Sequence, residues 1–104
     1  MSTYRVSLQA EEDVFEIWCY LAGQTSVDFA DQVESKLFEN FATLAQNPGL
    51  GHKREDLTRL PVRFYRAFPY QYMIVYRPTS PLEIVSVLHG RRNLKEVLER
   101  RELT

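Results

Sequence analysis

The sequence lacks the features that mark a secreted, membrane-bound or disulfide-stabilised protein. Its one cysteine, Cys19, cannot form an internal disulfide, which agrees with a reducing compartment. No apolar run approaches the roughly 20 residues of a membrane-spanning helix, and the polar start at residues 1–5 has no signal-peptide character. We therefore expect a cytoplasmic protein without a membrane partner, whose 104 residues form a single domain over residues 1–104.

Charge is distributed unevenly along the chain, although the net charge is only −1. Residues 1–40 contain eight acidic and two basic side chains, whereas residues 41–104 contain six acidic and eleven basic ones. Such an asymmetry suits a molecule with one face for an anionic partner. Solvated helix faces that balance by chance would produce the same pattern, so both interpretations stay open.

Two helices are predicted in the first half of the chain. Residues 10–22 place apolar side chains at helical spacing and acidic ones in the first turn, and Gly23 is the predicted stop. Thr25 or Ser26 is predicted to cap the second helix. That helix should end near Gln46, because the residue before a proline is pushed out of helical space. A short polar turn then makes the pair a helical hairpin.

Four strands are predicted, at residues 3–8, 62–68, 70–77 and 82–88, where apolar and aromatic side chains alternate or cluster. Asn93 is predicted to cap a short C-terminal helix. The predicted fold class is α+β: an N-terminal strand, an α-helical hairpin packed on one face of a mainly antiparallel four-stranded sheet, and the short helix. The candidate core residues are Trp18, Phe29, Val33, Leu37, Ile74 and Val85.

Four groups of residues follow one another along the chain in an order typical of one protein family. They are Ala10, Asp13, Ile17 and Tyr20; then Leu44, Pro48, Gly51, Arg54, Asp56 and Leu57; then Tyr76-Arg77; and finally Val87-Leu88-His89-Gly90-Arg91. Together with the order of elements, this pattern resembles the RelE/ParE toxin–antitoxin superfamily, and ParE-type toxins in particular. The resemblance extends over about residues 4–93.

The resemblance implies a toxin of a type II toxin–antitoxin system with a RelE/ParE-like fold. Its partner would be a ParD-like antitoxin, encoded beside it, that forms a hetero-oligomer with the toxin. ParE-like toxins poison DNA gyrase, which we expect here to occur by binding, without a metal or cofactor. Two alternatives stay open: a ribosome-dependent mRNA endoribonuclease of RelE type, and a non-toxic binding module of the same fold.

An endoribonuclease must take a proton from the 2′-hydroxyl, stabilise the phosphate and protonate the leaving oxygen. The candidates for these roles are His89, Arg91 and Arg66. However, no tyrosine follows Tyr76, and the C-terminal residues lack the aromatic or histidine side chain common in the nuclease branch. A histidine at a strand end also often bonds only to nearby backbone. These observations favour binding over catalysis.

Arginine and tyrosine side chains are the candidates for contacts with the antitoxin or the target, because protein interfaces are enriched in both. Tyr65 and Tyr72 are expected on a helix-free face of the sheet, which would receive the antitoxin together with the C-terminal helix. Adjacent arginines after a strand can grip carboxylates or phosphates. The candidate set is Arg54, Arg63, Tyr65, Tyr72, Arg91 and Arg92.

Several of these residues also have a purely structural interpretation. Arg54 and Asp56 can pair with each other, and the arginines at 91–92 can lie in a solvated turn. Gly51 is expected to adopt a positive φ in its loop. Cys19 is expected to pack beside a helix seam. The acidic residues Glu11, Glu12, Asp13 and Glu16 are expected in a solvated first turn rather than at a metal.

Overall fold

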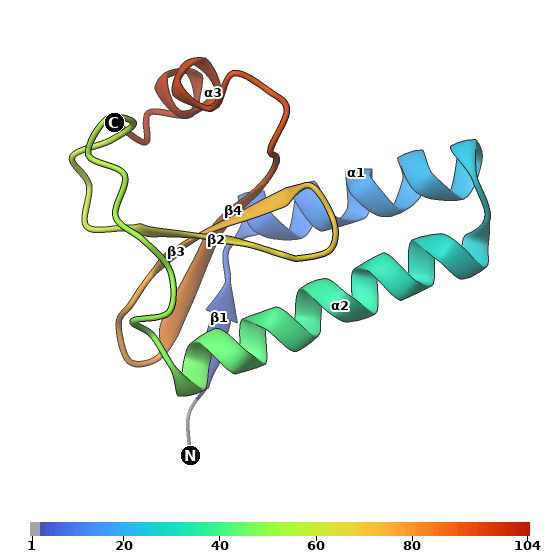
Figure 1. Cartoon of the computed structure of the whole chain (residues 1–104), viewed down its shortest axis with the longest axis horizontal. Helices are drawn as coiled ribbons and strands as arrows, with labels where there is room; N and C mark the ends of the chain where they lie inside the picture. Colours follow the sequence, from blue (N-terminus) through green and yellow to red (C-terminus); the bar gives the residue numbers. More distant parts are fainter. Residues whose placement is uncertain (1–2) are drawn as a thin grey trace.

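The computed structural model describes residues 3–104 as an α+β fold in which a helical hairpin covers one side of a sheet (Figure 1). This is the predicted fold class and element order. A third helix lies at the far end of the molecule, away from the hairpin. The elements in chain order are β1 (Tyr4–Val6), α1 (Leu8–Gln24), α2 (Val27–Gln46), β2 (Arg63–Arg66), β3 (Tyr72–Arg77), β4 (Leu82–His89) and α3 (Leu94–Arg100).

Side-chain caps determine where the three helices begin. Ser7 accepts the Ala10 N–H at 3.1 Å, so α1 starts two residues earlier than predicted and the first strand is shorter. Ser26 caps α2 through the Phe29 N–H, and Asn93 caps α3, as predicted. Each oxygen satisfies a backbone donor that the first turn leaves free. The predicted stop at Gly23 is wrong, because α1 continues through Gln24.

Gly23 therefore lies inside a helix, where glycine is unfavourable. A Cβ at this position would meet nothing within 4 Å. We expect Gly23→Ala to stabilise the protein by about 0.5–1 kcal/mol, because alanine restricts the unfolded chain and favours the helix. The urea unfolding midpoint should rise, and Ala22→Gly should lower it by a similar amount. A lower midpoint for Gly23→Ala would contradict the assignment.

The sheet has the strand order β1-β4-β3-β2 and is mixed. β2 pairs with β3 and β3 with β4 in antiparallel fashion, which confirms the mainly antiparallel prediction. β1 pairs with β4 in parallel and reaches only as far as the pair Val6 and Ile84. The second half of β4 thus has no strand beside it on that edge.

Two hydrophobic clusters lie on opposite faces of the sheet. The hairpin-side cluster includes Val33, Leu37 and Ile74, which confirms three of the predicted core residues. Val85 is buried but belongs to the second cluster, beneath α3. The members of this second cluster are Val62, Phe64, Val75, Val85, Leu88, Val97 and Leu98.

Three further predictions concern side chains of the helical hairpin, and their outcomes differ. Phe29 is half-buried and packs against the hairpin-side cluster. Trp18 is not a core residue, because it is half-buried and its indole N–H donates to Asp31 at 2.8 Å, joining α1 to α2 at the surface. The prediction of a packed Cys19 is also wrong, since this thiol is exposed.

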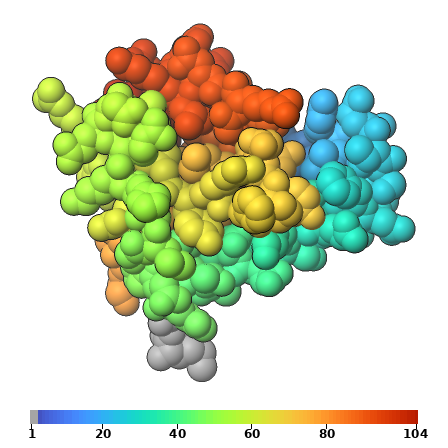
Figure 2. Space-filling view, viewed as in Figure 1, coloured from blue at the N-terminus to red at the C-terminus, as the bar shows by residue number. Residues whose placement is uncertain are grey.

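The face of the sheet opposite the hairpin is not free of helices, in contrast to the prediction. α3 packs over it, and Figure 2 shows the C-terminal segment (red) at one end of the molecule beside the loop after α2 (yellow-green). Tyr72 is only 8% exposed and shares the hairpin side with Ile74, two residues along the strand. Tyr65 pairs with Ile74 and packs against the same cluster, so both tyrosines face the hairpin.

The buried Tyr76 anchors the loop after α2. Its hydroxyl donates to the Pro48 carbonyl at 2.7 Å and accepts the Gly51 N–H at 2.8 Å, and burial raises the pKa of this phenol. Arg63 donates to the Gly51 carbonyl at 2.8 Å. No glycine in residues 3–104 has a positive φ, so that prediction for Gly51 is wrong. Its backbone lies so close to the Tyr76 ring that a side chain has no room.

None of the helices within residues 3–104 combines the length and apolar character needed to cross a lipid bilayer.

Candidate binding site

Asp13 is a carboxylate that α1 directs into the protein, where it is only 4% exposed. One carboxylate oxygen accepts the backbone N–H of Val87 at 2.9 Å, and the other accepts the Gln9 amide at 3.0 Å. The Val87 N–H lies on the part of the β4 edge that β1 does not reach, so a side chain replaces the missing strand. The prediction that Asp13 lies in a solvated turn is therefore wrong.

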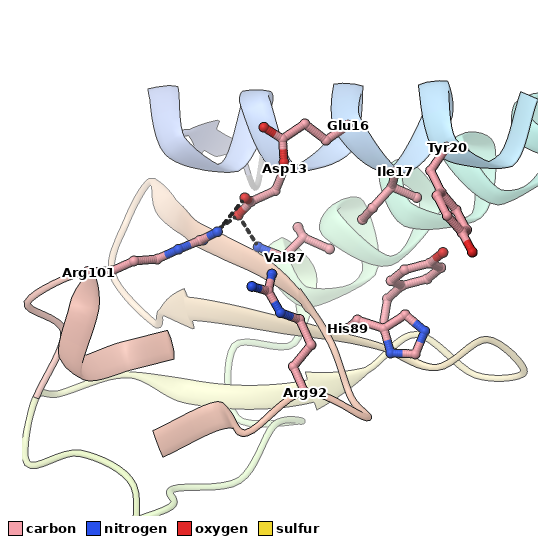
Figure 3. Close-up of a pocket in the computed structure, with 9 residues that line it drawn as sticks. Asp13, Glu16, Ile17, Tyr20, Val87, His89, Arg92 and Arg101 are labelled. Carbon is pink, nitrogen blue, oxygen red and sulfur yellow. Dashed lines mark hydrogen bonds and ion pairs between the residues drawn. The ribbon is translucent and has the colours of Figure 1, made fainter. Parts of the chain in front are cut away.

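Arg101, which follows α3, completes the environment of Asp13 with a bidentate ion pair (Figure 3). Its two terminal nitrogens donate to the two carboxylate oxygens at 2.8 and 2.9 Å, and one also donates to the Ser86 hydroxyl at 3.2 Å. Parallel charge-assisted bonds of this kind are among the strongest that side chains form. This Asp13–Arg101 clasp joins α1, β4 and the C-terminal segment.

A cleft of about 490 Å³ lies beside the clasp, between α1 and the end of β4. Ile17 and Tyr20 point from α1 toward the end of the strand, where His89 lies (Figure 3). Burial raises the pKa of the Tyr72 phenol in this cleft, and the nearby Tyr20 adds to the effect. The cleft is lined by Asp13, Glu16, Ile17, Tyr20, Tyr72, Val87, His89, Arg92 and Arg101.

His89 is held in place by its neighbours. Its Nδ1 accepts the Arg91 N–H at 3.1 Å, and its ring meets the Tyr72 ring edge-on with centroids 5.4 Å apart. The histidine thus makes the bond to nearby backbone that was predicted for a strand end. With Nδ1 as an acceptor, the proton of the neutral ring is on Nε2. Arg91 and Arg92 follow as exposed side chains, and neither makes an ion pair with a carboxylate of residues 3–104.

The remaining candidate arginines are engaged elsewhere. Arg54 forms a bidentate pair with Asp56 at 3.0 and 2.9 Å, which confirms the structural interpretation of these two residues. This hydrogen bonding raises the pKa of Arg54 and lowers that of Asp56. Arg66 donates to the Tyr70 carbonyl at 3.2 Å and lies over the Phe68 ring, 5.4 Å from its centroid.

The structure brings together only part of the candidate set. Tyr72, His89 and Arg92 line one cleft, with Arg91 close by. Arg63 pairs with Tyr76, at the opposite end of β3 from Tyr72, which is roughly 13 Å along the strand. The described residues contain no group of three or more side chains suited to holding a metal ion.

Sequence reasoning missed Arg101 entirely and misplaced Asp13. A signal for both was present. Asp13 lies three residues after the buried Ala10 and four before Ile17, inside the apolar stripe of α1. Arg101 likewise lies three residues after the buried Leu98, on the inner side of the last turn. A charged residue in an apolar stripe indicates a buried partner.

Three comparisons with known proteins agree with this architecture. A family model described as "ParE toxin of type II toxin-antitoxin system, parDE" matches residues 4–94. Toxin ParE1 of Caulobacter vibrioides is 28% identical over 95 residues, which cover 91% of this chain and 96% of that protein. A solved structure described as "Chromosomal ParDE TA system from P. aeruginosa" has a TM-score of 0.71 at 16% identity, covers 86% of this chain and 96% of its own, and shows the same fold.

Proposed function

The chain belongs to the ParE toxin family of type II toxin–antitoxin systems, and from this membership we propose that it inhibits DNA gyrase by binding and is neutralised by a ParD-like antitoxin. The partner class follows from the family, because a toxin of this kind is one component of a toxin–antitoxin pair. A gyrase target requires that the protein act in the cytoplasm.

Binding without catalysis is supported above all by the state of the candidate nuclease groups. The Nδ1 of His89 accepts the Arg91 N–H, which leaves only its Nε2 for proton transfer. Arg66 lies on β2, two strands away from β4, and donates to the Tyr70 carbonyl. General acid–base catalysis needs these groups within hydrogen-bonding reach of one reacting phosphate. Their separation favours an interaction surface.

Arg92 and Arg91 are the residues that we propose for contact with the target. Both are exposed at the end of β4, and Arg92 lines the cleft with Tyr20 and Tyr72. Arginine beside aromatic rings is the composition of interaction hot spots. Tyr72 lines the same cleft, whereas Tyr65 packs against the hairpin-side cluster. Arg54 and Arg63 hold the loop after α2.

The proposal is tested with purified gyrase and relaxed plasmid. We expect the protein to block supercoiling, and the antitoxin from the neighbouring gene to restore it. Arg91→Ala with Arg92→Ala should weaken inhibition by tenfold or more, since each arginine hot spot contributes at least about 2 kcal/mol to binding. Glu99→Ala, another exposed residue of the C-terminal segment, is the matched control and should inhibit like the unmodified protein.

Two other results would decide against gyrase. Messenger cleaved at the ribosomal A site, with supercoiling unaffected, would assign the endoribonuclease function. Normal growth of cells that express the protein without its antitoxin, with neither effect in vitro, would assign a non-toxic binding module.

A further inference from the structure

The turn between β2 and β3 carries an aromatic ring that the fold does not use. Phe68 is 70% exposed, more than any other aromatic side chain within residues 3–104. Its neighbour Ala67 is fully buried and donates its N–H to the Tyr72 carbonyl at 2.8 Å, so the alternation along the chain directs Phe68 outward. Figure 2 shows this turn (yellow) at the surface, between the C-terminal segment (red) and the helical hairpin (blue to green).

The exposed ring is nevertheless held in place. The Nε of Arg66 donates to the Tyr70 carbonyl at 3.2 Å, which fixes the guanidinium across the turn, 5.4 Å from the centroid of the Phe68 ring. The Phe68 N–H also donates to the Arg66 carbonyl at 2.9 Å. This order costs conformational entropy, yet the ring belongs to neither hydrophobic cluster of the described residues. A fixed apolar ring in solvent is typical of a preorganised binding group.

The turn adjoins the cleft beside the clasp. A second hollow of about 310 Å³ lies between the turn and the end of β4, with Pro69 and Arg91 in its lining. The hollow and the cleft share two lining residues, Tyr72 and His89, so they are neighbouring parts of one concave surface. Phe68 therefore lies at the rim of a surface that already contains the arginines proposed for contact with the target. We call residues 66–71 the anchor turn.

The anchor turn and the segment at the end of β4 are basic. Residues 66–72 and 89–95 contain no acidic side chain and four basic ones, Arg66, Arg91, Arg92 and Lys95. The last three are exposed, and none of them pairs with a carboxylate of the described part of the chain. This potential attracts carboxylates of a partner. Glu16 also lines the cleft, which disfavours a continuous chain of phosphates and favours a protein surface.

We propose that Phe68 is the anchor with which the toxin engages gyrase. Its ring enters an apolar pocket on the protein surface of the target, and acidic side chains around that pocket meet Arg91 and Arg92. Arg66 is a positioning residue, because its guanidinium holds the ring and is itself bonded to the turn. An aromatic ring beside arginines is the composition of an interaction hot spot. The inference rests on the proposed function, which supplies gyrase as the occupant.

The first test compares inhibition of supercoiling by purified full-length variants. Phe68→Ala should raise the concentration for half-inhibition by about 30-fold, the size of a hot-spot truncation. Its matched control is Phe15→Ala, which removes a ring of 66% exposure from α1 and should inhibit like the unmodified toxin. Thermal unfolding of both variants should stay close to that of the unmodified toxin, because neither ring belongs to a hydrophobic cluster. Equal losses for the two variants would overturn the anchor.

The positioning role of Arg66 is tested in two backgrounds. Arg66→Ala alone should weaken inhibition about two- to fivefold, the worth of one exposed cation–π contact. In the Phe68→Ala background the same change should have no further effect, since no ring is left to hold. An equal loss in both backgrounds would show that Arg66 contacts the target directly and would overturn its positioning role.

Direct binding assays identify the occupant. Labelled toxin should bind purified gyrase in the absence of DNA, and Phe68→Ala should weaken that binding. Antitoxin affinity and the sedimentation of the toxin alone should not change. The proposal would be overturned if Phe68→Ala weakened binding to a duplex oligonucleotide alone, which would assign the anchor turn to DNA. Lower antitoxin affinity with inhibition intact would assign it to the antitoxin, and altered sedimentation would assign it to a second copy.

The supercoiling assay also separates this inference from the proposed function. If Phe68→Ala and the unmodified toxin inhibit gyrase equally, the anchor is wrong and the proposed function stands. If the unmodified toxin leaves supercoiling unaffected, both proposals are wrong.

Discussion

Asp13→Ala should destabilise the folded protein by about 3–5 kcal/mol, the largest effect that we expect from one substitution. The change removes the acceptor for the Val87 N–H and for both terminal nitrogens of Arg101. Buried donors without a partner incur the full cost of desolvation. Urea-induced unfolding followed by Trp18 fluorescence measures the effect.

Arg101→Ala should have a comparable cost, because it leaves a 4% exposed carboxylate without its counter-ion. The double variant should lose clearly less than the sum of the two single losses, since neither charge is then left unpaired. Glu12→Ala, on the exposed side of α1, is the control and should change stability by less than about 0.5 kcal/mol. Additive losses would show that the two side chains act independently and would contradict the clasp.

Gly51→Ala should lower stability by about 3 kcal/mol, at the upper end of the cost of overpacking a core. The added Cβ would lie 2.7 Å from both the ring and the hydroxyl of Tyr76 and 2.9 Å from the Phe64 carbonyl. The Phe64 backbone blocks the added Cβ on one side, and the fully buried Tyr76 ring blocks it on the other. Relief would require the loss of the Tyr76 hydroxyl bonds that hold the loop after α2.

Gly49→Ala provides the matched control for this prediction. It lies two residues earlier in the same loop, and a Cβ there would meet nothing within 4 Å. We expect its unfolding midpoint to stay close to that of the unmodified protein. Equal losses for Gly49→Ala and Gly51→Ala would indicate a general need for glycine in the loop and would remove the role assigned to close packing.

The periodicity of apolar residues predicted the helices and strands because each pattern lies within a single segment of the sequence. The apolar stripe of α2 extends to within one turn of its end, and a proline follows it closely, so its end at Gln46 was correctly predicted. The start of α1 was missed because Ser7 and Leu8 fit both an alternating strand and a capped helix. The structure resolves the choice, since the Ser7 N–H donates to Ile84 and its side chain caps α1.

The site was harder to predict because its parts come from distant segments. The sequence shows that tyrosines are abundant in the central strands, but the face of the sheet on which each tyrosine lies depends on the strand register. Tyr72 faces the hairpin because it is two residues from Ile74 and therefore lies on the same side of β3. The second face seemed free because α3 has a small apolar surface, yet its two buried residues belong to the same cluster as Val85 and Leu88. The composition of α3 alone does not show that its residues pack on those of β4.

The clasp also limits when a newly made chain can complete its fold. Asp13 and Arg101 are 88 residues apart, and the sheet joins Tyr4 to Leu82. During synthesis α1 and α2 emerge first, but their apolar face has no sheet to cover until β3 and β4 follow. A chain interrupted before Arg101 would retain a carboxylate pointing into the protein without its cation. The fold around α1 can therefore close only after a segment 88 residues further along the chain has been made, so its stability depends on a contact between the first helix and the segment after α3.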